Sequence, residues 1–419
     1  MKNESADVDF MKYDIPKGTK EYYFTQAQLK NLIIRKIEQI YQRWGYQPLY
    51  TPSLQMMNVL NAKSGQEIQG QIFGIKDSEY GLRFDLTVGT ARFVATKKIP
   101  IPYKRYQIGQ VWRREEPQHS RLREFMQADI DIFGLDEPQA DAEVIAVAAN
   151  VLDELNFDEY YILLNNREIL EAIIKKYQEE KNENKILRIL DKIDKIGKDK
   201  VYNELIDLKI NKNLIDQIFE IDLQKANEIC PQGTERLKKI RDILINEFKI
   251  KNVEIDFSLA RGLAYYSSSV FEIKTKKEST SIAGGGRYDN LTEIYGQKIS
   301  AVGISFGIER LLNLIEENKN KIKIVQPVYI LTTENKYLKN AIDLLKKLHE
   351  KDIDAFCDYT QRNISKKLEY ANSLNIEYVV IIGKNEVENN SFTLKNMYTK
   401  NQQVNLSLDE LIKTIKQNR

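Results

Sequence analysis

The distribution of apolar residues along the chain begins with a helical pattern. Between residues 24 and 44, apolar side chains recur every three or four positions, which predicts an amphipathic helix with one buried face. Gly45 is the expected stop, because glycine commonly follows the last helical turn. Residues 46–52 then predict a strand that contains Pro48. Since proline cannot donate a hydrogen bond to a neighbouring strand, we expect this strand at a sheet edge or an interface.

The stretch from residue 81 to residue 134 predicts a strand, a helix and then a hairpin of two strands. The hairpin strands span 103–112 and 125–133, and a charged loop, 113–123, joins them. A helix is expected over 137–154, after an acidic residue and a proline that favour a helix start.

The pattern changes near residue 165. From there to 248, Lys, Glu, Asn, Ile and Leu recur at helical spacing, which indicates an inserted helical unit. Strands are expected over 253–257 and 270–275, and residues 281–286 lead into a glycine turn. A glycine-bearing strand near 303–306 precedes a helix that begins at about 307.

A charged linker at 316–323 marks a domain boundary. Beyond it, strands alternate with helices, which is typical of a compact α/β domain. The expected elements are a strand at 328–331, a helix at 336–350, a strand at 353–357, a helix at 363–374 and a strand at 378–382.

Composition narrows the class of protein. The 419 residues are 42% hydrophobic and 30% charged, as in a globular protein of two to four domains. A net charge of +2 does not indicate a nucleic-acid partner, so any basic surface must be local. The two cysteines, Cys230 and Cys357, are too few for a disulfide framework. Without a membrane-spanning run or a signal segment, a cytoplasmic location is expected.

Basic residues crowd the predicted hairpin. Arginine presents a planar fork that matches pairs of phosphate oxygens, and the ring of Phe125 could stack on a base. The alternative is a solvated hairpin with ordinary ion pairs. The basic residues are Lys104, Arg105, Arg113, Arg114, Arg121 and Arg123.

Three further clusters carry candidate chemistry. Residues 260–266 contain Arg261, and residues 283–289 contain three successive glycines, which allow a close approach of a ligand or a tight turn. The glycines form neither a Walker loop nor a dinucleotide-binding fingerprint. In the third cluster, Arg310 stands in the first turn of the helix after 303–306, where the alternative is an ion pair on the helix surface.

In this order and spacing, the clusters resemble the class II aminoacyl-tRNA synthetases and, among them, the histidyl-tRNA synthetase family. The likeness runs from about residue 12 to the C-terminus, and residues 259–266 and 283–289 distinguish the histidine branch from its relatives. Other segments resemble the three class motifs and the amino-acid-binding stretch. The first, second and third motifs correspond to residues 44–54, 103–134 and 303–312. The amino-acid-binding stretch corresponds to residues 63–65 and 82–87.

The resemblance implies three domains. The first is an α+β catalytic domain, with a mixed, largely antiparallel sheet flanked by helices, over 1–164 and 249–318. A helical insertion domain occupies 165–248, and an α/β anticodon-binding domain occupies 326–419. The first motif implies a homodimer.

The resemblance also implies a reaction: ATP-dependent activation of histidine and its transfer to the 3′ end of tRNA-His, with Mg²⁺ accompanying ATP. No protein motif alone predicts a metal site. Arg113 is expected to contact the α-phosphate and Arg261 to stabilise the developing charge from the other side. The remaining ATP-binding residues are expected to be Glu115, Arg121, Phe125 and Arg310.

Histidine has two ends to be recognised. The α-ammonium group needs acceptors, which the resemblance assigns to Asp85, Thr87 and Gln127. The imidazole nitrogens are assigned to Asp131 and Tyr266, with Tyr288 nearby, although Asp131 taken alone could be an acid in a strand-face ion pair. Candidate tRNA contacts are Gln118, Arg362, Lys366 and Lys367.

Two rival interpretations remain at this point. One is a histidine-sensing paralog that keeps the fold but lacks aminoacylation. Arg113, Arg261 and Arg310 argue against it, whereas Ala264, where the family often has aspartate, keeps it open. The other is a synthetase of the same class for threonine, proline or glycine, against which the 261–266 segment argues.

Overall fold

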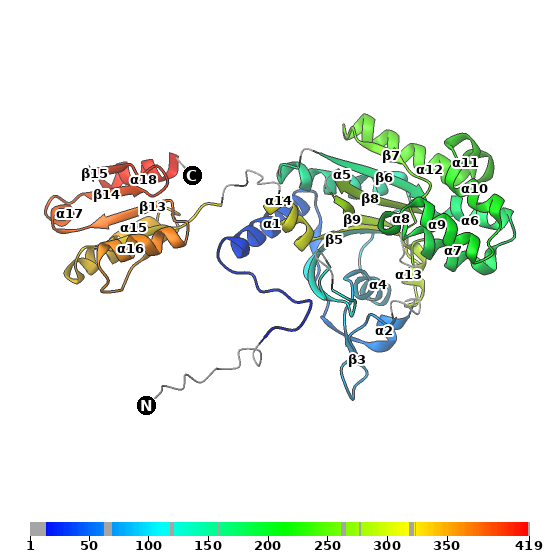
Figure 1. Cartoon of the computed structure of the whole chain (residues 1–419), viewed down its shortest axis with the longest axis horizontal. Coiled ribbons are helices and arrows are strands. Elements are labelled where there is room, and N and C mark those ends of the chain that lie inside the picture. Colours follow the sequence, from blue (N-terminus) through cyan, green and yellow to red (C-terminus); the bar gives the residue numbers. More distant parts are fainter. Residues whose placement is uncertain are drawn as a thin grey trace, which may run out of the picture. The chain divides into compact units, whose positions relative to one another are not determined.

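The computed structural model describes residues 14–62, 69–117, 121–157, 159–260, 265–275, 278–317, 322 and 324–417. The chain divides into two compact units (Figure 1). The catalytic unit lies within residues 1–21 and 30–322, and the C-terminal unit lies within residues 22–29 and 323–419. We describe each unit by itself.

An eight-stranded sheet organises the catalytic unit, and its strands follow the order β1-β4-β5-β10-β9-β8-β6-β7. The outer pairs β1–β4 and β6–β7 are parallel and all others are antiparallel, which confirms the mixed, largely antiparallel sheet. The strands are β1 (Gln47–Pro48), β4 (Tyr103–Trp112), β5 (Glu124–Phe133), β6 (Tyr160–Asn166), β7 (Val253–Ile255), β8 (Ser269–Thr275), β9 (Glu278–Arg287) and β10 (Ala301–Gly307).

Helices cover one face of this sheet. Helix α1 (Phe24–Arg43) was expected at 24–44, and its apolar positions Ile33, Ile37 and Ile40 are buried. Alternation along β5 turns Ala128, Ile130 and Ile132 toward this helical layer, where all three are fully buried. The Tyr41 hydroxyl donates to the Ala128 carbonyl at 3.2 Å, which fastens α1 to the sheet.

The other helices of the catalytic unit complete the layers. Helix α5 (Pro138–Glu154) is almost wholly buried, and α14 (Ile308–Glu317) follows β10, as predicted. The short helix α2 (Met57–Asn61) packs against the small sheet of β2 (Leu54–Met56) and β3 (Tyr80–Leu82). Helix α4 (Thr87–Thr96) packs against α2 and against the short α13 (Asp289–Glu293). Pro48 lies on the edge strand β1, as expected, and Gly45 after α1 has a φ of +82°.

The predicted glycine turn at 281–286 is wrong, because Gly284, Gly285 and Gly286 lie inside β9, near the middle of the sheet. A Cβ at Gly285 would come within 2.6 Å of the Phe271 ring, and one at Gly286 within 2.8 Å of the Tyr266 ring. These glycines therefore allow packing against both faces of a central strand.

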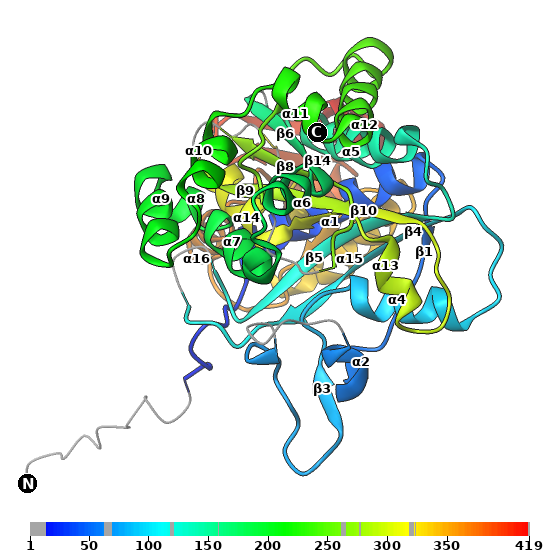
Figure 2. The ribbon, with the colours of Figure 1, turned by 90° about the vertical axis from the view of Figure 1, so that its right-hand side faces the viewer.

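The helical insertion lies between β6 and β7, and Figures 1 and 2 show its helices gathered together in green. Its helix α12 packs against α5 and β6 of the sheet layer. The boundaries 165–248 stay a prediction. The helices are α6 (Arg167–Lys176), α7 (Glu183–Leu190), α8 (Ile193–Ile196), α9 (Lys198–Asp207), α10 (Lys212–Glu220), α11 (Leu223–Ile229) and α12 (Pro231–Asp242), with short turns η2 (Glu180–Asn182) and η3 (Ile243–Glu247).

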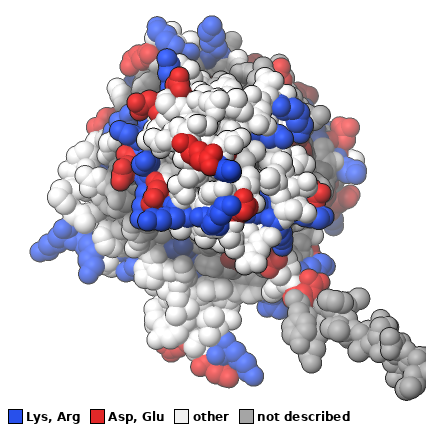
Figure 3. Space-filling view, turned by 90° about the vertical axis from the view of Figure 1, so that its left-hand side faces the viewer, with Lys and Arg blue, Asp and Glu red and all other residues white. Residues whose placement is uncertain are grey.

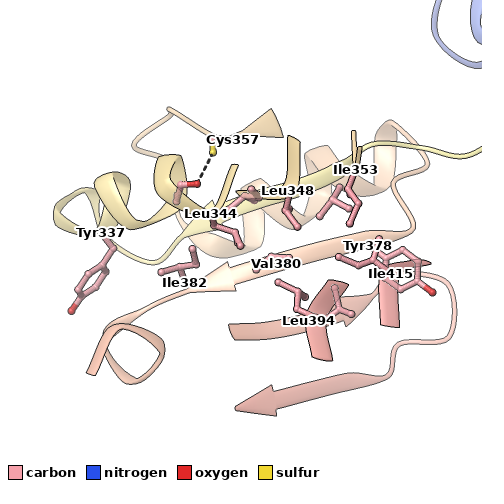
Figure 4. Packing of buried hydrophobic residues seen from close by; sticks show 14 residues of the cluster. Tyr337, Leu344, Leu348, Ile353, Cys357, Tyr378, Val380, Ile382, Leu394 and Ile415 are labelled. Carbon is pink, nitrogen blue, oxygen red and sulfur yellow. Dashed lines mark hydrogen bonds between the residues drawn. The ribbon is translucent and has the colours of Figure 1, made fainter. Parts of the chain in front are cut away.

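The C-terminal unit has a five-stranded sheet in the order β12-β11-β13-β14-β15. The alternating α/β prediction is confirmed for its first half. Figure 4 shows the core, in which Leu344, Leu348 and Ile415 from two helices pack on Val380 and Leu394 of the sheet. The elements are β11 (Val328–Thr332), η4 (Asn335–Tyr337), α15 (Leu338–His349), β12 (Ala355–Cys357), α16 (Ile364–Ser373), β13 (Tyr378–Ile382), α17 (Lys384–Glu388), β14 (Phe392–Asn396), β15 (Gln402–Leu406) and α18 (Leu408–Gln417).

Candidate active site

A cavity of about 1080 Å³ lies over the middle of the large sheet. Side chains of β5 point into it at every second residue, from Phe125 through Gln127 and Asp129 to Asp131. Strands β9 and β10 supply a floor that includes Gly284 and Gly303, whose lack of side chains leaves the space open.

Asp131 marks the deep end of the cavity. It is 2% exposed and forms an ion pair with the fully buried Arg105 at 2.5 Å, and the Tyr288 hydroxyl donates to its other oxygen. Burial raises the pKa of the Asp131 carboxyl, whereas Arg105 lowers it. Gly303 is paired with Asp131 across the sheet, and a Cβ there would run into the Asp131 carboxylate. The glycine is therefore needed for this acid to keep its position.

Three other acceptors surround the same end. Asp85 accepts from the backbone nitrogen of Val88 at 3.0 Å, at the start of α4, and Gln127 donates to the Ser305 hydroxyl at 2.9 Å. Burial raises the pKa of Asp85, and it raises the pKa of Asp129 to about 7 in spite of nearby Arg105. Asp129 was not singled out in the sequence.

Arginines line the opposite end. The Arg113 guanidinium donates to the Phe84 carbonyl at 3.0 Å and lies 5.1 Å from the centre of the Phe125 ring. Arg121 pairs with Glu115, and the Arg310 guanidinium donates to the Ser281 carbonyl at 2.6 Å. An end with three guanidinium groups and an aromatic face suits a ligand that carries phosphates and a base.

Glu309 and Lys30 support this arginine end. Glu309 lines the cavity, accepts from the Met126 backbone nitrogen at 2.9 Å and forms a buried ion pair with Lys30 at 2.8 Å. The sequence did not mark Glu309 as a cavity residue. Its actual role is to hold the strand that carries Phe125 and Gln127 against helix α1.

The insertion supplies part of the cavity wall. Lys185 and Arg188 of α7 and Lys192 after it line the cavity together with Glu204 of α9. Lys192 and Glu204 form an ion pair at 2.8 Å. These residues stand in a stretch where charged residues alternate with apolar ones throughout, so no local pattern distinguished them in the sequence.

Arg287, the residue before Tyr288, belongs to a second buried network of ion pairs. Arg287 is 1% exposed and pairs with Asp141 at 2.7 Å, and Asp141 is also paired with Arg236 of α12 at 2.8 Å. Arg287 also donates to Asp289 at 3.2 Å, beside the start of α13. Arg287 thus anchors the chain next to Tyr288 and does not line the cavity.

The structure brings together the described residues that were expected to bind histidine and ATP. All of them line the cavity: Asp85, Thr87, Arg113, Glu115, Arg121, Phe125, Gln127, Asp131, Tyr266, Tyr288 and Arg310. Arg261, Ala264, Gln118 and residues 63–65 lie outside the described residues.

Comparisons with known proteins agree with this geometry. A family model described as histidyl-tRNA synthetase matches residues 18–311, and one described as an anticodon binding domain matches residues 327–418. The chain belongs to the histidyl-tRNA synthetase family. The match places it in the histidine branch of the class II enzymes and not with those for threonine, proline or glycine.

Individual relatives cover nearly the whole chain. A histidine–tRNA ligase of Korarchaeum cryptofilum is 33% identical, over 96% of this chain and 98% of the relative. A histidine–tRNA ligase of Finegoldia magna is 36% identical, over 92% of this chain and 95% of the relative. The crystal structure of a Nostoc histidyl-tRNA synthetase is 25% identical, with a TM-score of 0.83, over 97% and 99%.

A further solved structure shares the fold alone. It is a Bacillus halodurans chain described as an ATP phosphoribosyltransferase regulatory subunit/histidyl-tRNA synthetase, which is 19% identical with a TM-score of 0.75. It covers 89% of this chain. The fold by itself therefore does not separate a synthetase from a regulatory relative, and the residues of the cavity must do so.

The C-terminal unit carries the other predicted contacts. Arg362 and Lys366 are exposed near the start of α16, but Lys367 is 3% exposed and its amine donates to the Thr332 carbonyl at 3.2 Å. Lys367 therefore supports the fold, and we keep Arg362 and Lys366 as candidates for RNA contact. On the face that Figure 3 presents, lysine and arginine side chains form a row across the surface.

The described ranges lack two features that would indicate a metal ion or a membrane. There, no three histidine, cysteine, aspartate or glutamate side chains are grouped so that they could hold a metal ion. In the same ranges, no helix combines the length and the apolar character that crossing a bilayer requires.

Proposed function

We propose that the cavity activates histidine with ATP and that the chain then transfers histidine to the 3′ end of tRNA-His. The observation that carries this proposal is the division of one cavity into two ends. Acidic and amide acceptors gather at the end with Asp131, and guanidinium groups gather at the end with Arg113. Family membership supplies the identity of the amino acid.

In the first step, a carboxylate oxygen of histidine attacks the α-phosphorus of ATP, and the bond to the pyrophosphate group breaks. The attacking carboxylate is already an anion, so no general base is required. The protein must hold two anions together and stabilise the charge on phosphorus, which positioned guanidinium groups do well. Arg113 takes this role in the described cavity, and Arg261 is expected to act from the other side.

Imidazole recognition follows from the fixed direction of the Asp131 and Tyr288 pair. The Tyr288 hydroxyl donates to Asp131, so one carboxylate oxygen is held by tyrosine and the other by Arg105. A carboxylate fixed in this way accepts the N–H of one imidazole tautomer, and Tyr266 stands at the same wall. An amino acid without ring nitrogens would cover this buried carboxylate without donating a hydrogen bond to it.

Mg²⁺ enters this proposal with the ATP phosphates. Glu115 is already paired with Arg121, and Glu309 with Lys30, so these carboxylates are engaged in the structure. The coordination shell of the ion would be built chiefly from phosphate oxygens and water. When bound, it would neutralise phosphate charge.

Transfer to tRNA is the second step of the proposal. The hydroxyl at the 3′ end attacks the carbonyl carbon of the adenylate, and AMP leaves. Lys185, Arg188 and Lys192 add positive charge to the wall that the insertion supplies. That charge suits the approach of an RNA end.

We also propose a homodimer, in line with the resemblance of residues 44–54 to the first class motif. Leu54, Met56 and Tyr80 on the small β2–β3 sheet are 48%, 39% and 45% exposed. They line a groove of about 250 Å³ together with Arg92. An apolar surface of this kind is typical of a contact between copies. Light scattering that found only monomer would contradict this part.

The test of the proposed function is ATP-dependent charging of a tRNA-His transcript with labelled histidine. The expected result is stable labelling of the intact tRNA and none of a tRNA whose terminal ribose has been oxidised by periodate. Absence of charging by a well-folded chain, with ATP and Mg²⁺ present, would overturn the proposal.

A further inference from the structure

Besides Asp131 Oδ2, which lies in the ion pair with Arg105, three buried side-chain oxygen atoms of the cavity lining have no hydrogen-bond partner within the described part of the chain. They are Asp85 Oδ2, Gln127 Oε1 and Asp129 Oδ1, and all three side chains line the cavity. Asp85 is 4% exposed and Asp129 is 2% exposed. Because an unsatisfied buried acceptor is costly, three of them around one space indicate a ligand that brings donors.

The remaining polar atoms of these side chains are engaged, which leaves each with one acceptor for a ligand. Asp85 Oδ1 accepts from Val88, and Gln127 Nε2 donates to Ser305. Asp129 is paired with Ser305 across the sheet and hydrogen-bonds to its hydroxyl. Thr87, by contrast, is hydrogen-bonded to the Tyr265 hydroxyl.

We propose that Asp129 is a specificity-determining residue that accepts one N–H of the α-ammonium group of histidine. Asp85 and Gln127 accept the other two. This inference deepens the proposed function and rests on it. An ammonium group has three donors and no acceptor, which matches three single acceptors. Asp129 then adds a buried acceptor to Asp85 and Gln127.

Carboxylates, guanidinium groups and hydroxyls all surround Asp129, so the geometry of the acceptors, and not a simple count of charges, supports an ammonium ligand. The groups that face Asp129 are Arg105, Arg83, Asp131 and Asp85, with the hydroxyls of Tyr41, Tyr265 and Ser305.

Proton release gives this arrangement a measurable consequence. Burial raises the pKa of Asp129 to about 7, so near neutral pH the empty site holds a proton for part of the time. An ammonium group beside the carboxylate favours its ionised form. Histidine binding should therefore release a proton from Asp129 when the solution is at about pH 7 or slightly below.

The test is a cycle of two proteins and two ligands. The affinities of wild type and Asp129→Asn for histidine and for imidazolepropionate, which lacks the ammonium group, are measured by calorimetry. Inhibition of the exchange reaction gives a second measure of the affinity for imidazolepropionate. Loss of a charge-assisted hydrogen bond should weaken the affinity for histidine about 10- to 100-fold. The affinity for imidazolepropionate should change less than about threefold. Equal weakening of both ligands would overturn the inference, and so would no weakening of either.

A matched control is Glu272→Gln, which makes the same carboxylate-to-amide change at a buried acid of β8. Glu272 is 8% exposed and does not line the cavity, so both ligands should keep their wild-type affinities. If this control lost affinity for histidine but not for imidazolepropionate, that would count against a direct contact between Asp129 and the ammonium group.

A second measurement needs no variant. Calorimetry in two buffers of different ionisation enthalpy, with triazolylalanine as the ligand, counts protons released by the protein, because the triazole ring stays neutral near pH 7. Release of a fraction of a proton is expected, and none would overturn the inference. Wild-type protein that fails to bind histidine at all would instead undo the proposed function.

Discussion

At the scale of single residues, Asp131 connects the sheet to the choice of substrate. Its carboxylate is held by Arg105 on one side and by Tyr288 on the other, and Gly303 leaves the space that it occupies. Because both oxygens are fixed before a ligand arrives, little reorganisation is needed to bind an imidazole.

We expect Asp131→Asn to raise the KM for histidine about 10- to 100-fold, because a charge-assisted hydrogen bond of roughly 1.5–3 kcal/mol is lost. The KM for ATP should stay within about twofold, since the arginine end is untouched. Steady-state pyrophosphate exchange measures both constants. Similar increases in the two constants would contradict an imidazole contact.

Asp129 should leave a signature in stability as well. The carboxyl has an ordinary pKa of 3.8, and in the folded protein burial raises the pKa of Asp129 to about 7. Between these values the folded state holds a proton that the unfolded state has lost, so stability should fall as pH rises from about 4 to about 7 and be level above. Urea unfolding of wild type and Asp129→Asn checks this, because the variant should lack that part of the slope. Identical pH profiles for the two proteins would contradict it.

Some of these residues could be predicted from local sequence segments, whereas the roles of others depend on contacts between distant parts of the chain. Arg113 and Tyr288 stand in recognisable segments, and the cavity contains both. Asp129 looked like an ordinary strand residue, and Arg105 was grouped with the basic residues that could bind phosphate. Only the pairing of β5 with β4 and β10 brings the two into one buried cluster, in which Arg105 pairs with Asp131. Lys367 looked like a surface lysine until its place under Thr332 was known.

At the scale of elements, the outcome depended on whether the pattern was local. Helix α1 and the β4–β5 hairpin follow from period and turn signals, and both were predicted within a residue or two. The glycines of β9 were mistaken for a turn, because their packing partners Phe271 and Tyr266 come from other elements. Strands β14 and β15 were missed, since β15 is largely exposed and shows no apolar alternation.

Helix α12 is tied to the sheet layer by Arg236, and we expect Arg236→Ala to loosen it. The guanidinium donates to Asp141 at 2.8 Å and to the Asp136 carbonyl at 2.6 Å. Its loss should lower the free energy of unfolding by about 1–3 kcal/mol and speed hydrogen exchange in α12. The KM for histidine should stay within about twofold.

Lys239→Ala is the control on the same helix. Lys239 pairs with Glu235 at 2.7 Å, but the two side chains are 59% and 64% exposed, so the free energy of unfolding should change far less than in Arg236→Ala. Equal effects of the two substitutions would mean that the Asp141 network does not anchor α12.

At the scale of the whole molecule, activation and tRNA recognition should separate between the two compact units. The cavity belongs to the catalytic unit, and the anticodon-binding match belongs to the C-terminal unit. Each unit has its own hydrophobic core, so a surface change in one should leave the chemistry of the other intact.

The double variant Arg362→Ala, Lys366→Ala should raise the KM for tRNA about 3- to 30-fold and leave histidine-dependent exchange unchanged. Both side chains are exposed at the start of α16, where phosphate contacts would depend on salt. Charging assays at several salt concentrations should show a shallower dependence for the variant. Lys384→Ala, at an exposed lysine of α17, is the control. Wild-type tRNA kinetics in the double variant would remove these residues from the interface.

The most direct test of the account is pyrophosphate exchange into ATP with each of the twenty amino acids in turn, without tRNA. Robust exchange is expected with histidine and none comparable with any other amino acid, because only histidine satisfies both the acceptor end and the Asp131–Tyr288 pair. Histidine binding without exchange would contradict it and indicate a sensor that keeps the fold. Exchange driven by a different amino acid would contradict the assignment of the deep end of the cavity.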